Sequence, residues 1–170
     1  MSTESDIAMH LDAEEGAGTQ YLTFLLASEH YGLNILQVQE IRGWEHVTRI
    51  PNAPDYVKGV INLRGTIVPV LDLRQRFKLT VAAYTKETVV IVVRANGKDD
   101  AERSLGLVVD AVSDVLVAQD DEILTTPDFG ANVPTENILG LVSENDQMVM
   151  LLDVTSLIES DAPLADAETG

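Results

Sequence analysis

The feature that most constrains the fold is an internal repeat of a hydrophobic strand–turn–strand segment. Residues 57–73 (VKGVINLRGTIVPVLDL) align without a gap on residues 138–154 (ILGLVSENDQMVMLLDV), 81 positions further along the chain. Gly59 coincides with Gly140, and most apolar positions coincide as well. Two apolar runs separated by a polar turn pair predict a β-hairpin, so the chain contains two copies of one hairpin.

A second pair of segments repeats at an offset of 74, where residues 31–41 align on residues 105–115. Gly32 then coincides with Gly106, and the two offsets differ because the loop lengths differ. Together the repeats indicate a duplicated unit of about 70 residues with roughly five strands, the size of a small SH3-like barrel. Small units bury a modest fraction of their surface. We therefore predict an all-β fold of two intertwined five-stranded SH3-like barrels around a shared core, with short helical turns and a groove between the barrels.

The other segments also favour short strands over long helices. Residues 20–27 and 87–95 have strand patterns, and residues 74–77 (RQRF) are expected to form a helical turn. Residues 34–43 fit either a short helix or an extended bend, because their apolar spacing is compatible with both. Residues 96–104 (NGKDDAERS) are predicted to be a polar loop.

Acidic segments flank the predicted domain, which spans residues 20–158. Residues 1–19 contain five acids, no Lys or Arg and no periodic apolar face, so they are predicted to be a disordered leader. The same composition predicts a disordered tail at residues 159–170. No apolar run approaches the roughly 20 residues of a membrane helix, and a signal-peptide pattern is absent. With no cysteine, a disulfide framework and thiolate chemistry are excluded. A soluble cytoplasmic protein is expected.

The net charge of −17 is unevenly distributed along the chain. Residues 42–86 carry eight Lys and Arg against three acids, whereas residues 87–158 carry three against fourteen. The basic segment could dock an acidic partner, or it could neutralise the acidic half internally, and composition does not separate these alternatives. Nucleic acid is a poor candidate partner, because the overall field repels phosphate.

Catalytic and metal-binding motifs are absent from the sequence. The histidines His10, His30 and His46 have no metal-ligand spacing. Asp72 and Asp153 each follow a predicted buried strand and are expected to cap the turn that comes next. The sequence therefore predicts a protein without enzymatic activity, metal or cofactor.

Three motifs in order, VQEIRG, VKGVINLRG and IVPVLDLR, give residues 20–158 a specific resemblance to the CheW family of bacterial chemotaxis coupling proteins. The resemblance implies two SH3-like barrels, as the repeat does. It also implies an adaptor that joins the cytoplasmic hairpin tip of chemoreceptors to the regulatory domain of the histidine kinase CheA. The expected location is the cytoplasm, at membrane-associated receptor arrays, with no direct membrane insertion.

The resemblance also implies two sets of contact residues. The receptor tip would lie in the groove between the barrels, against a set of seven residues: Val38, Glu40, Gly59, Arg64, Thr88, Val89 and Gly106. A second contact, toward the kinase regulatory domain, would involve Val112 and Phe129.

Each of these positions also has a purely structural interpretation. The three valines could belong to the core, the two glycines could serve strand geometry, and Phe129 could be a buried loop residue. Glu40 and Arg64 could be two solvated charges, or they could pair and fix the hairpin tip beside the groove. We predict the pairing.

The repeat bears on Arg64, because the second hairpin has Asn145–Asp146 where the first has Arg64–Gly65. A hairpin of this kind needs a polar tip but not an arginine, which favours a partner contact for Arg64. Three alternatives remain open. A coupling protein of another chemosensory pathway, such as one governing pili, would carry the same motifs. A small oligonucleotide-binding barrel would need a basic groove with exposed aromatic residues, which this acidic chain with few aromatics does not favour. The third is an enzyme, and turnover lost on mutating Asp72 or Asp153 would favour it.

Overall fold

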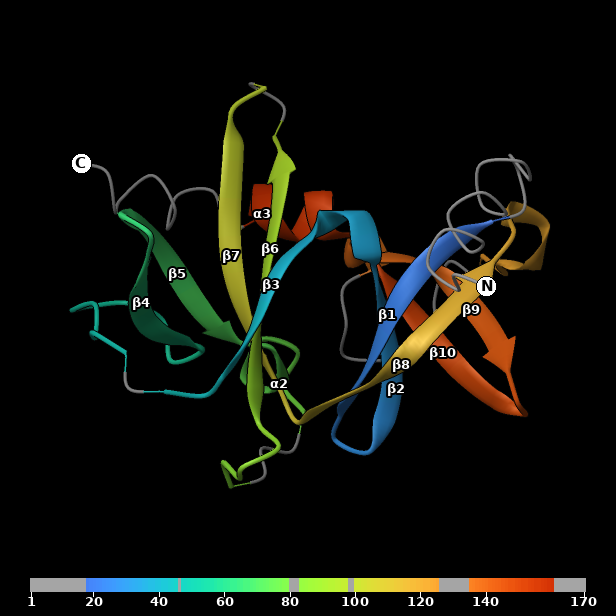
Figure 1. The fold of residues 1–170 in the computed structure, drawn as a ribbon, viewed down its shortest axis with the longest axis horizontal. Coiled ribbons are helices and arrows are strands. Elements are labelled where there is room, and N and C mark those ends of the chain that lie inside the picture. The colour runs from blue at the N-terminus through green and yellow to red at the C-terminus, as the bar shows by residue number, and fades with distance from the viewer. Residues whose placement is uncertain (1–17, 46, 80–82, 98–99, 126–134, 161–170) are drawn as a thin grey trace, which may run out of the picture.

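The structure is a computed structural model that describes residues 18–45, 47–79, 83–97, 100–125 and 135–160. Within these residues the chain forms two five-stranded sheets that lie side by side (Figure 1). Sheet A has the order β8-β1-β2-β10-β9, with β1 at Thr19–Leu26, β2 at Glu29–Asn34, β8 at Ala111–Ala118, β9 at Ile138–Glu144 and β10 at Gln147–Leu152. Sheet B has the order β3-β6-β7-β5-β4, with β3 at Val38–Gly43, β4 at Val57–Leu63, β5 at Thr66–Asp72, β6 at Val89–Asn96 and β7 at Glu102–Val109.

The two sheets share one topology, and they exchange strands. Strands β1 and β2 precede the strands of sheet B in sequence but pair with β8 and β10, so the two repeats are intertwined as predicted. Each sheet has an equivalent parallel pairing, since Gly32 lies opposite Leu151 in sheet A and Gly106 lies opposite Val70 in sheet B. The all-β fold of two SH3-like units is confirmed.

The first hairpin and its copy also share an irregularity. The β4–β5 ladder shifts register between Val57 and Gly59, and the β9–β10 ladder shifts at the equivalent position, opposite Leu151 and Leu152. Gly59 has a φ of +147° at this bulge, and a Cβ there would collide with the carbonyl of Thr48. A Cβ on Gly140 would lie 2.7 Å from the carbonyl of Leu124. Both glycines are therefore required by the close approach of a neighbouring backbone segment.

Buried side chains form a shared core and an interior for each sheet. The shared core lies between the sheets and includes Phe24 and Leu33 from sheet A with Ile91 and Leu107 from sheet B. The interior of sheet A contains residues such as Tyr21 and Leu116, and that of sheet B contains residues such as Val70 and Val92. Each sheet thus buries side chains on both faces, which two packed barrels require.

Short helical segments join the strands. The segment left open between helix and bend is a 3₁₀ turn, η1 (Ile35–Gln37), followed by β3. The predicted helical turn is α2 (Leu73–Arg76), and Asp72 accepts a hydrogen bond from the Arg74 amide as its N-cap. The equivalent Asp153 accepts one from Ser156 at the start of α3 (Val154–Ser160). Two further 3₁₀ turns are η2 (Asp120–Glu122) and η3 (Thr135–Asn137).

Two segment boundaries differ from the sequence prediction. Residues 96–104 were predicted to be a loop, which is wrong for Asn96 and for residues 102–104, because the β6–β7 ladder continues to the pair Asn96 and Glu102. The outer residues of the β6–β7 hairpin are polar, but their backbones still pair. The hairpin therefore projects beyond the other strands of the sheet (Figure 1). Helix α3 continues to Ser160, two residues into the segment predicted as a tail. The remaining residues of the predicted leader and tail are outside the described ranges, except Gly18 and Thr19 at the start of sheet A.

Candidate functional site

The candidate site lies between the two edge strands β3 and β8. Directly paired residues of neighbouring strands point to the same face of a sheet. Ile41 of β3 pairs with the core residue Ile91, and Val115 of β8 pairs with the core residue Leu22. The outward rows of β3 and β8 therefore continue the shared core to the surface.

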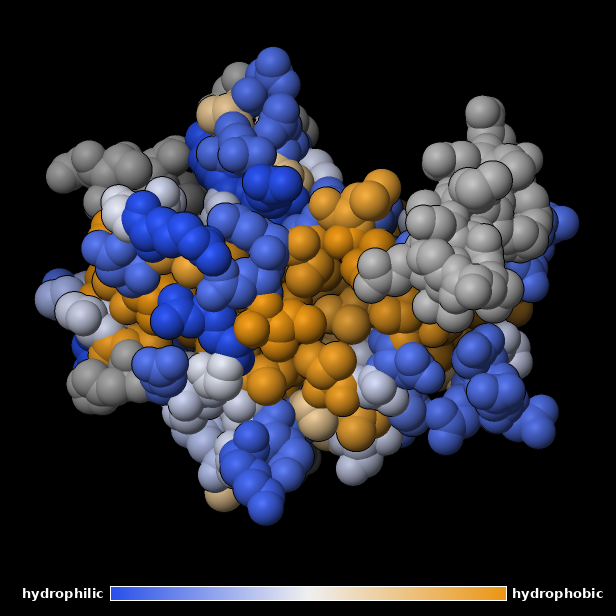
Figure 2. Space-filling model, viewed as in Figure 1, coloured by the Kyte–Doolittle hydropathy of each residue, from blue (hydrophilic) through white to orange (hydrophobic). Residues whose placement is uncertain are grey.

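These outward rows are apolar and accessible. We name them, with η1 and the start of β6, the apolar seam; its members are Leu36, Val38, Ile41, Val89, Val112, Val115 and Val117. Leu36 is 81% exposed, Ile41 44%, Val115 39% and Val117 47%. Val38, Val89 and Val112 are half-buried and pack against the shared core. Figure 2 shows hydrophobic residues gathered in the middle of the molecule, between the two sheets. Contiguous exposed apolar surface of this kind typically marks an interaction site.

An ion pair lies on the opposite face of β3. Arg64 Nη2 is 3.0 Å from Glu40 Oε1, so the predicted pairing is confirmed. The contact is an ion pair without hydrogen-bond alignment, since Glu40 Oε1 accepts no hydrogen bond from the described residues. Arg42 Nε lies 3.7 Å from the other carboxylate oxygen of Glu40. Glu40 is on β3, at one edge of sheet B, and Arg64 is in the β4–β5 turn, at the other edge. The ion pair therefore links these two edges, which are not joined by a ladder of backbone hydrogen bonds.

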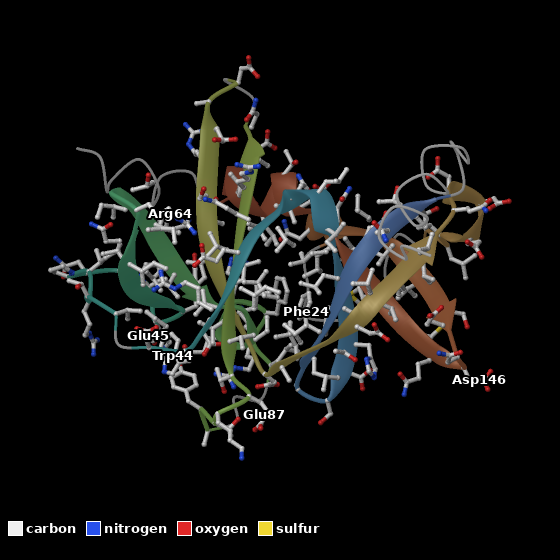
Figure 3. The ribbon with its side chains drawn as sticks, viewed as in Figure 1. Phe24, Trp44, Glu45, Arg64, Glu87 and Asp146 are labelled. Carbon is white, nitrogen blue, oxygen red and sulfur yellow. The ribbon has the colours of Figure 1, made fainter. Side chains whose placement is uncertain are left out.

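Arg64 has an unusual backbone conformation for its residue type. Its φ is +51° and that of Gly65 is +90°, which is the pattern of a tight hairpin turn that favours Asn, Asp or Gly. The turn is held by a hydrogen bond from the Gly65 amide to Asn62 Oδ1 at 2.7 Å. The second copy has Asn145 at φ +51° in the equivalent position. The fold therefore tolerates Arg64 but does not need it, and the guanidinium, whose side chain is 74% exposed, lies at the rim of sheet B (Figure 3).

Other predicted site residues are explained by the fold itself. Thr88 is buried; its hydroxyl accepts a hydrogen bond from the Thr85 amide, and its carbonyl accepts one from the Trp44 amide. A Cβ on Gly106 would lie 2.9 Å from Val90 Cγ1, inside sheet B. With Gly59, these residues shape the backbone of sheet B, and their contact with a partner stays a prediction. Phe129 lies outside the described residues.

Sequence reasoning missed Leu36, Ile41, Arg42, Val115 and Val117 as members of this region. The signal in the sequence was the alternation of side chains along a strand. Val38 and Ile41 are three residues apart and would point to opposite faces of a regular strand, but the bulge after Val38 puts both on the same face. The bulge itself was not visible in the sequence. Exposure of Leu36 also depends on η1, which turns the chain from β2 of sheet A into β3 of sheet B.

A buried charged network joins the two sheets behind the site. Arg74 is fully buried and donates to both carboxylate oxygens of Asp72 and, at 2.7 Å, to Asp110. Asp110 accepts a hydrogen bond from the amide of Ala27, in the β1–β2 turn of sheet A. The hydrogen bond with Asp72 is the main cause that raises the pKa of Arg74 above its ordinary value. Because both carboxylates are satisfied, the network fixes the turn of sheet A against sheet B.

Aromatic side chains cover this network on the side of β3. The Tyr84 hydroxyl donates to Asp72 at 3.0 Å, and the Tyr84 ring lies 4.6 Å from that of Trp44, which follows β3. Burial, followed by the negative charge of Asp72, raises the pKa of Tyr84 to about 12. Tyr84 is therefore neutral at physiological pH and holds its proton toward the carboxylate.

Two further observations limit the chemistry of the described residues. Among them, no three His, Asp or Glu side chains gather where they could hold a metal ion. None of their helices is both long and apolar enough to span a bilayer. The fold is therefore that of a β protein with two SH3-like units, and its described surface carries the exposed apolar seam between β3 and β8.

Comparison with known proteins agrees with this class. The profile of the CheW-like domain matches residues 20–162, so the chain belongs to the CheW-like family. It is 44% identical over 149 residues to the chemotaxis protein CheW of Klebsiella aerogenes, covering 88% of this chain and 87% of that protein. It is 34% identical over 157 residues to the CheW of Rhizobium meliloti, covering 92% and 96%. The crystal structure of the scaffolding protein CheW from Thermoanaerobacter tengcongensis superimposes with a TM-score of 0.73 at 32% identity, covering 84% of this chain and 88% of that one.

Proposed function

We propose that this chain is a non-enzymatic adaptor that couples the cytoplasmic tips of chemoreceptors to the histidine kinase CheA, in the cytoplasm at membrane-associated receptor arrays. The observation that carries the proposal is the exposed apolar seam between β3 and β8. An amphipathic helix binds by laying its apolar face along such a surface. The names of the family relatives, chemotaxis proteins and a scaffolding protein, support this role.

Within this proposal the residues have separate tasks. Val38 and Val89 form the floor of the receptor site, and Ile41 and Val115 form its walls. Gly59, Thr88 and Gly106 maintain the backbone that supports it. Val112, on the half-buried part of β8, and Phe129 contribute to the contact with the kinase regulatory domain.

The test is a pull-down with a chemoreceptor cytoplasmic fragment and CheA, followed by a measurement of kinase activity with and without the receptor fragment. Both proteins should be retained, and kinase activity should respond to the receptor only when this chain is present. Retention of neither protein would refute the proposal.

A matched pair of variants locates the receptor contact. Val115 and Leu139 are both 39% exposed, but Val115 is on the seam strand β8 and Leu139 is on β9, at the other edge of sheet A. Val115→Ser should weaken receptor binding about tenfold, as expected for the loss of one buried aliphatic side chain. Leu139→Ser should leave it unchanged. Equal effects of the two variants would place the receptor elsewhere.

A further inference from the structure

The parallel ladder of sheet B is shorter than its copy in sheet A. In sheet A, residues 149–151 of β10 pair with residues 30–32 of β2. The repeat aligns this ladder on residues 68–70 of β5 and residues 104–106 of β7, but only the last of the three pairs is formed in sheet B. The first halves of β5 and β7 are therefore not joined by a ladder.

A proline accounts for the missing pairs. The Gly97 amide donates to the Ala101 carbonyl, so alternate residues of β7, Ser104 among them, direct their backbone groups away from β6 and toward β5. The two missing pairs would need the amide of residue 69 as donor to the Ser104 carbonyl, and Pro69 has no N–H. The second copy has Met150 at this position. A single substitution between the repeats thus leaves the outer half of β7 without a neighbour on one edge.

A cavity lies between the two strands where the pairs are missing. We name it the β5–β7 slot; it has a volume of about 300 Å³, and its lining includes residues 66–69, residues 101–104 and Arg94. The equivalent cavity of sheet A, which contains His30 and Val149 of the longer ladder, measures about 120 Å³. Figure 1 shows β5 and β7 close together at their C-terminal ends and apart at their N-terminal ends. The shorter ladder therefore gives sheet B a wider opening than sheet A has.

The slot presents the groups that bind an extended polypeptide. By the alternation along β7, Glu102 and Ser104 direct amides and carbonyls toward it, and no ladder joins them to β5 in the described residues. On the other side, the slot is lined by Ile67, which is 41% exposed. An extended segment binds such a free strand edge through its own backbone groups, and its side chains add specificity. The slot therefore has the chemistry of a site for β-strand addition.

The charges of the slot favour an acidic segment. Its ionisable side chains are Arg94, Arg103 and Glu102, so the slot is net positive in a chain whose net charge is −17. Arg94 is exposed and has no ion-pair partner among the described residues. A second copy of this chain is a poor occupant, because two molecules with this net charge repel each other.

We propose that the β5–β7 slot is a second interaction site, at which an extended acidic segment of a protein partner is added to β7 as a further strand. Pro69 is the residue that keeps the slot open. This inference goes beyond the proposed function and does not depend on it, since the apolar seam lies between β3 and β8.

A capped hexapeptide that alternates glutamate with valine is the probe, and the same peptide with lysine in place of glutamate is its control. In an NMR titration of the full chain, the acidic peptide should shift the amide signals of Glu102 and Ser104, with a dissociation constant on the order of 1 mM, the range for a few exposed backbone hydrogen bonds. N-methylation should abolish binding at every second peptide residue only. Shifts that miss β7, or equal binding of both peptides, would overturn the proposal.

Pro69→Met places the residue of the second copy in sheet B. The new amide should become protected from hydrogen exchange as the ladder extends, and the acidic peptide should bind about tenfold more weakly, because β5 then occupies the edge of β7. Pro54→Met, in the loop before β4, is the matched control and should leave binding unchanged. Unchanged binding to a folded Pro69→Met variant would mean that the peptide does not use this edge, and the proposal would fail.

Two exposed variants test the charge of the slot without altering its backbone. Arg94→Gln should weaken binding of the acidic peptide about two- to fivefold, and Glu102→Gln should strengthen it by a similar factor, the range of an exposed charge pair. The absence of both effects would refute the acidic partner.

Other occupants give different results. A dimer in sedimentation that Pro69→Met converts to a monomer would assign the slot to a second copy, and peptide binding only after removal of residues 161–170 would assign it to this chain. Either result would overturn the proposal.

Discussion

The two barrels of this molecule have the same backbone and different side chains at the same places. Gly59 and Gly140 occupy equivalent bulges, and both hairpin turns use two residues with positive φ. At the rim, however, sheet B has the ion pair of Glu40 with Arg64, whereas Asp114 of sheet A has no ion-pair partner among the described residues. Backbone geometry is shared because close packing permits few solutions. The side chains that differ at the rim lie at the surface, where a substitution in one barrel does not disturb the packing of the other.

The helical turns after the two hairpins show the same contrast in the interior. In sheet B the turn α2 carries the buried Arg74, which joins Asp72 and Asp110. The equivalent residue in α3 is Thr155, whose hydroxyl accepts a hydrogen bond from Gln37. A single buried cation thus connects one hairpin to both sheets, and the other copy relies on neutral contacts.

The largest effect is expected from Arg74→Thr, which places the residue of the second copy in the first. Removal of the guanidinium leaves the buried Asp72 without its partner, and breaking a buried pair costs about 4 kcal/mol. Urea unfolding followed by circular dichroism measures the change in free energy. As a control, Thr155→Ala removes the hydrogen bond from Gln37, which water can replace, and should cost about 1 kcal/mol. A loss below 1 kcal/mol for Arg74→Thr would show that the network is not needed for stability.

Gly59→Ala should have the next largest effect. The new Cβ would meet the Thr48 carbonyl at a positive φ, so strain and overpacking together should cost about 3 kcal/mol. Gly65→Ala is the matched control, since its φ is +90° but its Cβ would lie in open space, and about 1 kcal/mol is expected. Thermal unfolding of both variants separates the cost of the backbone conformation from the cost of the contact with Thr48. Equal losses would mean that conformation alone, and not the contact with Thr48, makes Gly59 necessary.

A smaller effect is expected from the rim ion pair. A double-mutant cycle of Glu40→Ala and Arg64→Ala should give a coupling of about 0.5 kcal/mol in stability, because the Arg64 side chain is exposed. In receptor binding the two losses should again be non-additive, since each variant releases the other side chain from the rim. As a control, the equivalent cycle of Asp114→Ala and Asn145→Ala in sheet A should be additive. Strictly additive losses for Glu40→Ala and Arg64→Ala as well would mean that the ion pair does not fix the hairpin tip.

The smallest effect concerns alkaline pH. The pKa of Tyr84 is raised to about 12, above its ordinary value of 10, so the folded state keeps a proton that the unfolded state loses. The stabilisation from neutral Tyr84 is therefore complete below pH 10 and is lost as the pH rises from 10 to 12. Phenolate absorbance of the native chain minus that of Tyr84→Phe should show one tyrosine titrating near 12. A difference curve centred at 10 would contradict the hydrogen bond to Asp72.

The residues of the candidate site were only partly predictable from the sequence. The pairing of Glu40 with Arg64 was predicted as an alternative to two solvated charges, and it is confirmed. Gly59, Gly106 and Thr88 were identified, but sequence alone could not decide between a surface role and a backbone role, which depends on neighbours such as Thr48 and Trp44. The solvent-facing row of Ile41, Val115 and Val117 was missed, since apolar residues on an edge strand have the same pattern as core residues.

The sequence by itself determined the repeat, the two hairpins with their polar turns, the capped helical turns and the absence of catalytic motifs, because all of these depend on residues close together in the chain. Only the tertiary structure decided that β1 and β2 pair with β8 and β10. Strand pairing joins segments distant in sequence, and local propensity does not choose among the available edges. That one choice packs the two sheets against each other around a shared core.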